Sequence, residues 1–384
     1  MRNSKRIVAC ILALGLLLSV GCSSTAPAVT TTQAPATTAA QGAVTTQAPA
    51  TTEAAAPQHD PVEIEIYTSA AGSFTYVLGI AWAELINTNS SWVKATAIES
   101  QGPSVNELMM YSDASKRPNT VYTATAYNAY HGYGDFSDKQ NTRSKLMFSF
   151  GLSANVLLTT DKTINTLQDM VDKNKLMLLR TPRTMTFNPY WEALFNGSVN
   201  GQMNYEYMDF TSSVEAMMAN RAGAFIGAMQ PLSGDMTSYA GNPATEELFS
   251  RASYFKFLDF PLEMDKVLQN EVGGPFESFP GSIVPVPAQS LHATQTEPVN
   301  VCMVPSYFFA DEDMDPEIVY EITRIFGENA SSLGDYHPQA AAITPDVMAI
   351  YTFPREYHPG AMRYLDEKGI SPVHVNDFMA AVTK

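Results

Sequence analysis

The sequence predicts an α/β protein with a largely parallel sheet, because short strand-like runs are followed repeatedly by small-residue turns and helical runs. In the first unit, residues 62–68 have the composition of a β-strand and residues 69–73 form a turn of small residues. Apolar side chains then recur at helical spacing over residues 74–87. In such sheets, ligands bind where the carboxyl ends of strands meet the following helices.

A second unit repeats this order. Residues 93–99 predict a strand, residues 100–103 a turn, and residues 104–111 a helix. Ser104 and Glu107 have the spacing of a capping box, in which each side chain accepts a hydrogen bond from the other residue's backbone N–H.

A third unit follows later in the chain. Residues 175–179 predict a strand, residues 180–188 a loop, and residues 189–195 a helix. We expect Asn188 to cap this helix and Pro189 to occupy its first position, where proline lacks only an N–H that would be unpaired anyway.

The N-terminus is typical of an export signal. Residues 1–6 carry three cations, and residues 7–20 form an uncharged, mostly aliphatic run of 14 residues. This run is shorter than the roughly 20 residues of a membrane span. Cys22 follows a Val-Gly pair and resembles the cysteine of the bacterial lipobox, although Ser19 stands where leucine is usual. We expect a lipoprotein signal at residues 1–21 and an extracytoplasmic protein that is lipid-anchored to the cell membrane through Cys22. The alternative is an ordinary secreted protein.

Residues 22–59 form a segment rich in Thr, Ala, Pro and Gln. The motif TTQAPATT occurs at residues 31–38 and again at 45–52, a repeat of 14 residues. Such a composition cannot bury enough apolar surface to offset the entropy of ordering. We expect a disordered tether with an end-to-end distance of roughly 30–40 Å as a coil.

Charge and cysteine content limit the possible functions. The formal charge is −16, and loss of the three leader cations lowers Lys+Arg from 23 to 20 against 39 Asp+Glu, or −19. This balance argues against nucleic acid as a partner. Cys10 leaves with the signal and Cys22 receives lipid, so Cys302 is the one remaining thiol and no internal disulfide can form. Residues 60–384 are long enough for two domains with a large core.

Three motifs of this body are similar to those of the TAXI family of TRAP-transporter solute receptors. They are KATAIESQGPSVNELMM at residues 94–110, EIVYEIT at 317–323 and YTFPREYHPGAMRYLDEKGI at 351–370. The resemblance extends over about residues 62–370 and is most specific at His358 and the Pro-Gly-Ala that follows.

This resemblance implies a type II periplasmic-binding-protein-like fold, in which two α/β lobes are joined by crossover strands. We expect the first lobe at residues 60–159 and 299–384 and the second at 160–298. The implied partner is a TRAP-type integral-membrane permease, and the implied ligand is a small organic anion or amino acid, with no cofactor and no metal. The loops at 68–76 and 180–186 lack most of the glycines that the family carries there.

The ligand-binding residues that we predict lie on the turns after the expected strands. They are Ser69, Ala70, Ser73, Phe74, Tyr76, Gln101, Gly102, Tyr127, Asn128, Arg180, Thr181, Arg183, Thr184 and Gln230.

Two kinds of group in this set could bind a carboxylate. The turn at residues 69–73 would offer free backbone N–H groups at a helix start, where the macrodipole is worth roughly half a positive charge. An arginine can form a bidentate pair with the carboxylate. We predict this role for Arg183 and, as a second choice, Arg180. Loop arginines also form solvated ion pairs, and Tyr127 could simply pack in the core.

Other residues have structural explanations. His358-Pro-Gly predicts the start of a helix, and Asp315 before Pro316 predicts helix capping rather than a metal site. Cys302 lies in an apolar run, which predicts a buried, inert thiol. The sequence has no G-x-S-x-G, no H-E-x-x-H and no phosphate loop ending in G-K-[ST].

These observations favour a non-enzymatic solute receptor of a TRAP-type transporter. Two alternatives remain open: a solute-binding protein of an ABC importer or sensor system, and an exported hydrolase on an unrecognised scaffold.

Overall fold

The computed structural model describes residues 59–71, 73–124, 126–132, 136–181, 183, 187–262, 281–352 and 356–383. Residues 58–384 form one compact unit, separate from residues 1–57. The predicted leader, the lipidation residue Cys22 and nearly all of the predicted tether lie outside the described residues.

The elements of this unit alternate between strand and helix over much of its length. The strands are β1 (Val62–Tyr67), β2 (Val93–Ile98), β3 (Thr120–Thr123), β4 (Ser144–Thr159), β5 (Leu176–Arg180), β6 (Asn204–Met208), β7 (Ala224–Pro231), β8 (Tyr239–Gly241), β9 (Lys256–Leu258), β10 (Ser282–Val286), β11 (Val299–Asp311), β12 (Ile350–Tyr351) and β13 (Val373–His374). The α-helices are α1 (Phe74–Asn89), α2 (Pro103–Ser112), α3 (Ala126–His131), α4 (Leu167–Asp172), α5 (Asn188–Gly197), α6 (Phe210–Met218), α7 (Pro243–Arg251), α9 (Pro316–Glu328), α10 (Pro345–Met348), α11 (Pro359–Glu367) and α12 (Val375–Val382). Short 3-10 turns are η1 (Arg117–Asn119), η4 (Ala330–Asp335) and η5 (Pro338–Ala342).

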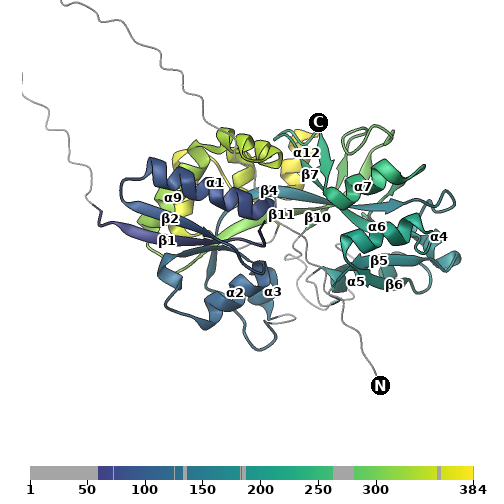
Figure 1. Cartoon of the computed structure of the whole chain (residues 1–384), viewed down its shortest axis with the longest axis horizontal. Coiled ribbons are helices and arrows are strands. Elements are labelled where there is room, and N and C mark those ends of the chain that lie inside the picture. The colour runs from purple at the N-terminus through teal and green to yellow at the C-terminus, as the bar shows by residue number, and fades with distance from the viewer. Residues whose placement is uncertain are drawn as a thin grey trace, which may run out of the picture. The chain divides into compact units, whose positions relative to one another are not determined.

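One sheet holds most of these strands, in the order β2-β1-β3-β11-β4-β7-β5-β6. β1 pairs in parallel with β2 and β3, and β5 pairs in parallel with β6 and β7. We call β2-β1-β3 the first sheet half and β7-β5-β6 the second sheet half. β11 and β4 lie between the halves and connect them (Figure 1). The predicted α/β class, with parallel sheet segments joined by crossover strands, is confirmed.

The two crossover strands are the longest of the sheet. β4 has 16 residues and β11 has 13, and they run antiparallel to each other. Their pairing shifts register between Ser306 and Tyr307, and the partner of Ser306 is Gly151. Gly151 has a φ of +151°, a conformation open to glycine and strained for other residues. The strands therefore change their pairing where they pass from one sheet half to the other.

The described residues form three buried clusters. One fills the space around β1, β2, α1, α9 and α11 and includes Trp82, Phe148 and Phe326. A second lies around β7, α6, α7, β10 and α12. The third combines Tyr122 of the first sheet half with Trp191 beside the second and Phe309 of β11. Apolar packing is therefore continuous from one half to the other along the crossover strands.

Several local predictions agree with the structure. Helix α1 begins after Ser73, whose Oγ accepts a hydrogen bond from the Tyr76 N–H at 3.2 Å. Asp315 caps α9. His358 is fully buried and caps α11, and its Nε2 lies 3.1 Å from the Met314 carbonyl.

The predicted capping box of α2 is wrong. The helix begins one residue earlier, at Pro103 after Gly102, and the Gly102 cap forms no side-chain hydrogen bond. Glu107 is instead fully buried, and its Oε1 accepts from Asn141 Nδ2 at 2.8 Å and from Ser144 Oγ at 2.6 Å. Tertiary partners have replaced the local one.

Asn188 does not cap α5 either. Phe187 occupies the cap position, and Asn188 is the first helical residue. Its Nδ2 donates to the carbonyl of Arg180 at 2.5 Å. Because this bond joins the helix start to the end of β5, Asn188 shapes the loop between them.

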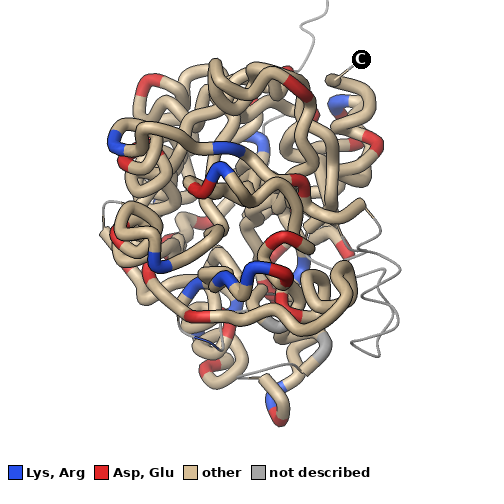
Figure 2. Tube along the Cα trace, turned by 90° about the vertical axis from the view of Figure 1, so that its right-hand side faces the viewer, with Lys and Arg blue, Asp and Glu red and all other residues tan. Residues whose placement is uncertain are grey.

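The surface charges are mixed. On the side shown in Figure 2, Lys and Arg residues are interspersed with Asp and Glu, and they do not form a continuous basic face among the described residues. Within the described part of the chain, no helix has both the length and the apolar character needed to cross a bilayer.

Candidate functional site

The carboxyl ends of β1 and β3 in the first sheet half are held together by one buried side chain. Asn106, on α2, is almost completely buried. Its Nδ2 donates to the carbonyls of Thr68 and Thr123, both at 3.0 Å. Thr123 Oγ1 also donates to the Thr68 carbonyl at 2.8 Å. One amide therefore holds the ends of the two strands together. Sequence reasoning did not select Asn106, because its role depends on three segments far apart in the chain.

The turn at residues 69–73 is satisfied largely from within the chain. The Ala71 N–H donates to Glu99 Oε1 at 3.0 Å, and the Ser73 N–H donates to the Ala70 carbonyl at 3.1 Å. The Ser69 carbonyl accepts from the Ser100 N–H at 3.2 Å. The expectation of free N–H groups at this turn is therefore wrong for Ala71 and Ser73, and the Glu99 carboxylate makes the turn unfavourable for a second anion.

The next turn is similar. Gln101 is exposed, whereas Gly102 is buried and has a φ of +113°. The Gly102 N–H donates to Ser100 Oγ at 3.1 Å. Only glycine adopts this backbone conformation without strain.

The aromatic candidates are partly structural. Tyr127 is 6% exposed, and its ring packs edge-on against Tyr190 of α5 with centroids 5.7 Å apart. This contact joins α3, beside the first sheet half, to α5, beside the second. Asn128 and Tyr76 are half-buried. Phe74 lies 5.0 Å from the His337 ring and 6.3 Å from Phe150.

Arg180 ends β5, and its guanidinium reaches the crossover strand β4. Its Nη2 donates to Asn155 Oδ1 of β4 at 2.8 Å, and its Nε is buried without a partner. The guanidinium lies 4.4 Å from the Phe210 ring and 5.5 Å from the Trp191 ring. No carboxylate of the described residues contacts it, and burial lowers its pKa to about 10. The guanidinium remains charged, and no carboxylate in the part of the chain that the structure describes balances it.

Arg183 has a different environment. Its side chain is 74% exposed, lies 3.9 Å from Glu192 Oε2, and stacks 5.3 Å from the Tyr207 ring. An exposed ion pair of this kind contributes little energy. Thr181 is also exposed. Thr184 lies outside the described residues.

A cavity of about 230 Å³ lies against the crossover strands. Phe74 and Thr75 contribute to it from the start of α1, and Gln230 and Pro231 from the end of β7. Two predicted residues, Phe74 and Gln230, therefore come together here. The other lining residues are Phe150, Gly151, Leu152, Ser153, Ser306, Gln339 and Ala342.

The cavity and the Arg180 guanidinium both contact strand β4, at positions two residues apart. Ser153 lines the cavity and Asn155 accepts the hydrogen bond from Arg180. Side chains two apart on a strand share a face and are separated by roughly 7 Å. The guanidinium therefore lies near the cavity along β4, while neither Arg180 nor Asn155 is among the described residues that line it. Sequence reasoning selected Arg180 and Gln230 but missed Asn155, Ser153 and Gln339, which carry no motif.

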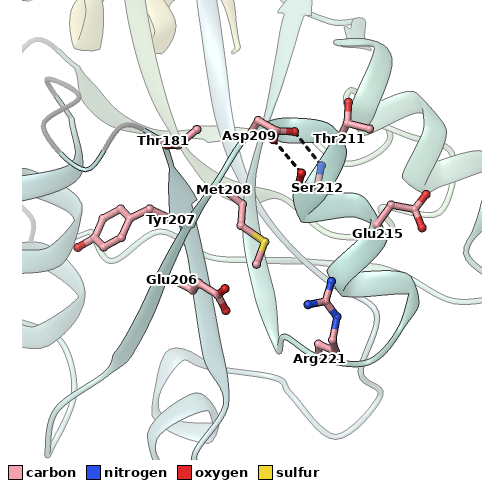
Figure 3. A pocket seen from close by; sticks show the side chains of 9 residues that line it. All are labelled: Thr181, Glu206, Tyr207, Met208, Asp209, Thr211, Ser212, Glu215 and Arg221. Atoms are coloured by element: carbon pink, nitrogen blue, oxygen red, sulfur yellow. Dashed lines mark hydrogen bonds between the residues drawn. The ribbon is translucent and has the colours of Figure 1, made fainter. Parts of the chain in front are cut away.

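A larger groove, of about 530 Å³, lies at the ends of β5 and β6 (Figure 3). Thr181 lines it, together with the carboxylates of Glu206, Asp209 and Glu215 and one cation, Arg221. The Asp209 carboxylate accepts from the Ser212 N–H and Oγ at 2.8 and 2.7 Å and caps α6. With three acidic groups against one basic group, this groove is unsuited to an anion.

Reactive groups are few in the described residues. Cys302 is fully buried, and burial raises the pKa of its thiol to about 12, which keeps it protonated and unreactive. No cluster of three metal-ligating side chains occurs in the ranges that the structure describes.

Comparison with known proteins gives a family match. The model of the NMT1-like family matches residues 66–369. No curated protein matches the chain.

Several solved structures are similar. MatC from Rhodopseudomonas palustris with bound malate is 12% identical, with 84% of this chain and 99% of that chain covered and a TM-score of 0.43. The periplasmic aliphatic sulphonate binding protein SsuA from Escherichia coli is 13% identical, with 84% and 85% covered and a TM-score of 0.41. The probable amino-acid ABC transporter extracellular-binding protein YtmK from Bacillus subtilis is 10% identical, with 74% and 99% covered and a TM-score of 0.40.

Proposed function

Because this chain belongs to the NMT1-like family, we propose that it is an extracytoplasmic solute receptor, which captures a small carboxylate and delivers it to a membrane permease. The observation that carries the proposal is Arg180, a largely buried guanidinium without an anionic partner among the described residues. A bound carboxylate would balance this charge and could pair with it in bidentate geometry. The adjoining cavity would hold the rest of the solute.

The proposal includes two lobes that close on the solute. We assign residues 60–159 and 299–384 to one lobe and 160–298 to the other. The solute would touch Arg180 in the second lobe and Phe74 in the first, so that only the closed state gains both sets of contacts. The neighbouring position of Ser153 and Asn155 on crossover strand β4 supports this arrangement.

The finer assignment rests on the sequence motifs. Their similarity to the TAXI family supports a TRAP-type permease, in which an ion gradient rather than ATP would drive uptake. An ABC importer or a sensor system is the alternative partner. The leader-like N-terminus and the tether composition support attachment to the membrane through lipid on Cys22.

A ligand screen by thermal shift on residues 58–384, the compact unit, tests the proposal. A ligand at 100 times its Kd stabilises the folded protein by about 2.7 kcal/mol. We expect Arg180→Gln to abolish the shift given by carboxylates, because it removes the unbalanced charge and keeps hydrogen-bonding capacity. Arg183→Gln is the matched control, and we expect it to retain the shift because Arg183 is exposed and already paired with Glu192.

The opposite pattern, with the shift lost in Arg183→Gln and kept in Arg180→Gln, would assign the anion to Arg183 instead. Recovery of the solute in a chemically altered form would support the exported hydrolase.

A further inference from the structure

The cavity beside Arg180 is neutral. Among its described lining residues there is no Lys, Arg, His, Asp or Glu. Its polar groups are the hydroxyls of Thr75, Ser153 and Ser306 and the amides of Gln230 and Gln339, and the rings of Phe74 and Phe150 supply apolar surface.

The two amides form one unit. Gln339 Nε2, on η5, donates to Gln230 Oε1, at the end of β7, at 2.9 Å. A primary amide offers two donors and an acceptor with two lone pairs. After this bond, the pair can still bind a neutral amide or hydroxyl group of a solute.

Among the described residues, the two arginines of the β5 end do not offer a second anion site at this cavity. Arg180 carries one charge next to Asn155. Arg183 is exposed and pairs with Glu192. On the first-half side, the turn that precedes Phe74 is bonded to the Glu99 carboxylate.

We propose that the solute is a monocarboxylate with a short neutral remainder, and that dicarboxylates are excluded. This inference rests on the proposed function and adds the substrate class. The carboxylate binds Arg180, and the remainder lies in the neutral cavity against the glutamine pair. A second carboxylate would find only neutral hydroxyl and amide donors among the described lining residues and no cation to balance its charge, which is less favourable than burial of a neutral amide there. A volume of about 230 Å³ lies below the lower end, about 300 Å³, of typical small-molecule sites, so the remainder is small.

The test compares pairs of acids that differ in one group. Succinamate and glutaramate have a neutral amide where succinate and glutarate have the second carboxylate. Calorimetric titration of the mature protein from Cys22, purified in detergent because of its expected lipid anchor, gives each Kd. We expect the amide acids to bind at least 10-fold more tightly than the dicarboxylates.

Gln339→Arg then adds a cation at the cavity and keeps a donor for Gln230 Oε1. We expect this variant to reverse the preference within each pair. Gln202→Arg, at an exposed position before β6, adds the same charge elsewhere and should leave the preference unchanged.

Two results would overturn the inference. If the wild-type protein binds the dicarboxylates as tightly as the amide acids, and Arg180→Gln abolishes that binding, the monocarboxylate assignment fails and the proposed receptor function stands. If none of these acids binds to the wild-type protein or to Gln339→Arg, the monocarboxylate assignment fails as well. If, in addition, no carboxylate of the wider screen gives a thermal shift that depends on Arg180, the proposed function also fails.

Discussion

Asn106 is the residue on which the geometry of the first sheet half depends most. A buried side-chain amide stabilises the fold through the hydrogen bonds that it makes, and Asn106 makes them through Nδ2 alone, because its Oδ1 is buried without a partner among the described residues. Asn106 Nδ2 bonds the carbonyls that end β1 and β3, and Thr68 Oγ1 bonds the carbonyl of Ile98 at the end of β2. Side chains therefore hold the ends of all three strands, so the turns that follow begin from fixed positions.

We expect Asn106→Ala to lower the free energy of unfolding by about 2 kcal/mol, because it removes the shared donor and leaves a small cavity. Urea unfolding of residues 58–384 measures this change. Asn119→Ala, at an exposed position in η1, is the control and should change stability by less than about 0.5 kcal/mol. Equal stability of the two variants would show that water or the neighbouring hydroxyls replace the amide.

At the same scale, the sequence identified the right kinds of side chain more readily than their environments. It pointed to Arg180 and Arg183, because both follow the predicted strand at residues 175–179, and it favoured Arg183. Nothing in the chain distinguishes the burial of the two side chains. The structure places Arg180 against Asn155 and two aromatic rings and leaves Arg183 largely in solvent. Those partners come from distant segments, so local spacing could not reveal them.

Among the elements, helix α1 has the clearest start signal. Ser73 Oγ accepts from the Tyr76 N–H, and the helix continues for 16 residues to Asn89. The same residue is also a predicted ligand contact. Substitutions at this one position can therefore separate capping from binding.

We expect Ser73→Ala to destabilise the unit by about 1 kcal/mol through loss of the cap, whereas Ser73→Asp keeps the cap and stability. If Ser73 faces the solute, the added negative charge of Ser73→Asp will also weaken binding of a carboxylate at least 10-fold. Chemical denaturation and titration with the same acid measure the two effects. Unchanged affinity in Ser73→Asp would restrict Ser73 to the role of a cap.

Element boundaries were predictable where the signal is local. Ser73, Asp315 and His358 each bond a backbone N–H within three residues, and each helix starts where the sequence predicts. The prediction failed at Glu107, which has the right spacing for a local bond. Glu107 instead bonds Asn141 and Ser144, more than 30 positions away. A local motif yields when a buried tertiary partner competes for the same carboxylate.

For the whole molecule, strand-turn-helix repetition predicted the α/β class, but it could not give the order of strands. β11 pairs with both β3 and β4 although it follows them by more than 130 residues. This pairing places Ser306 beside Gly151, and both residues line the cavity. Asn155 lies on the same strand as Gly151. The site therefore depends on contacts between segments far apart in the chain, which a single sequence does not encode in any local pattern.

Anchoring and solute binding are expected to be separable, because residues 58–384 form a compact unit without residues 1–57. We expect Cys22→Ser to move the protein from the membrane fraction to the soluble extracytoplasmic fraction, since a lipid on that thiol is the proposed anchor. The Kd for a carboxylate should stay within about twofold of the wild-type value, because the described residues around Arg180 and the neutral cavity all belong to the compact unit. Fractionation with immunoblotting measures the location, and titration of the two purified forms measures the affinity.

Retention of Cys22→Ser in the membrane fraction would show that the apolar leader stays attached as the anchor. A large change in Kd would show that the tether takes part in the binding site.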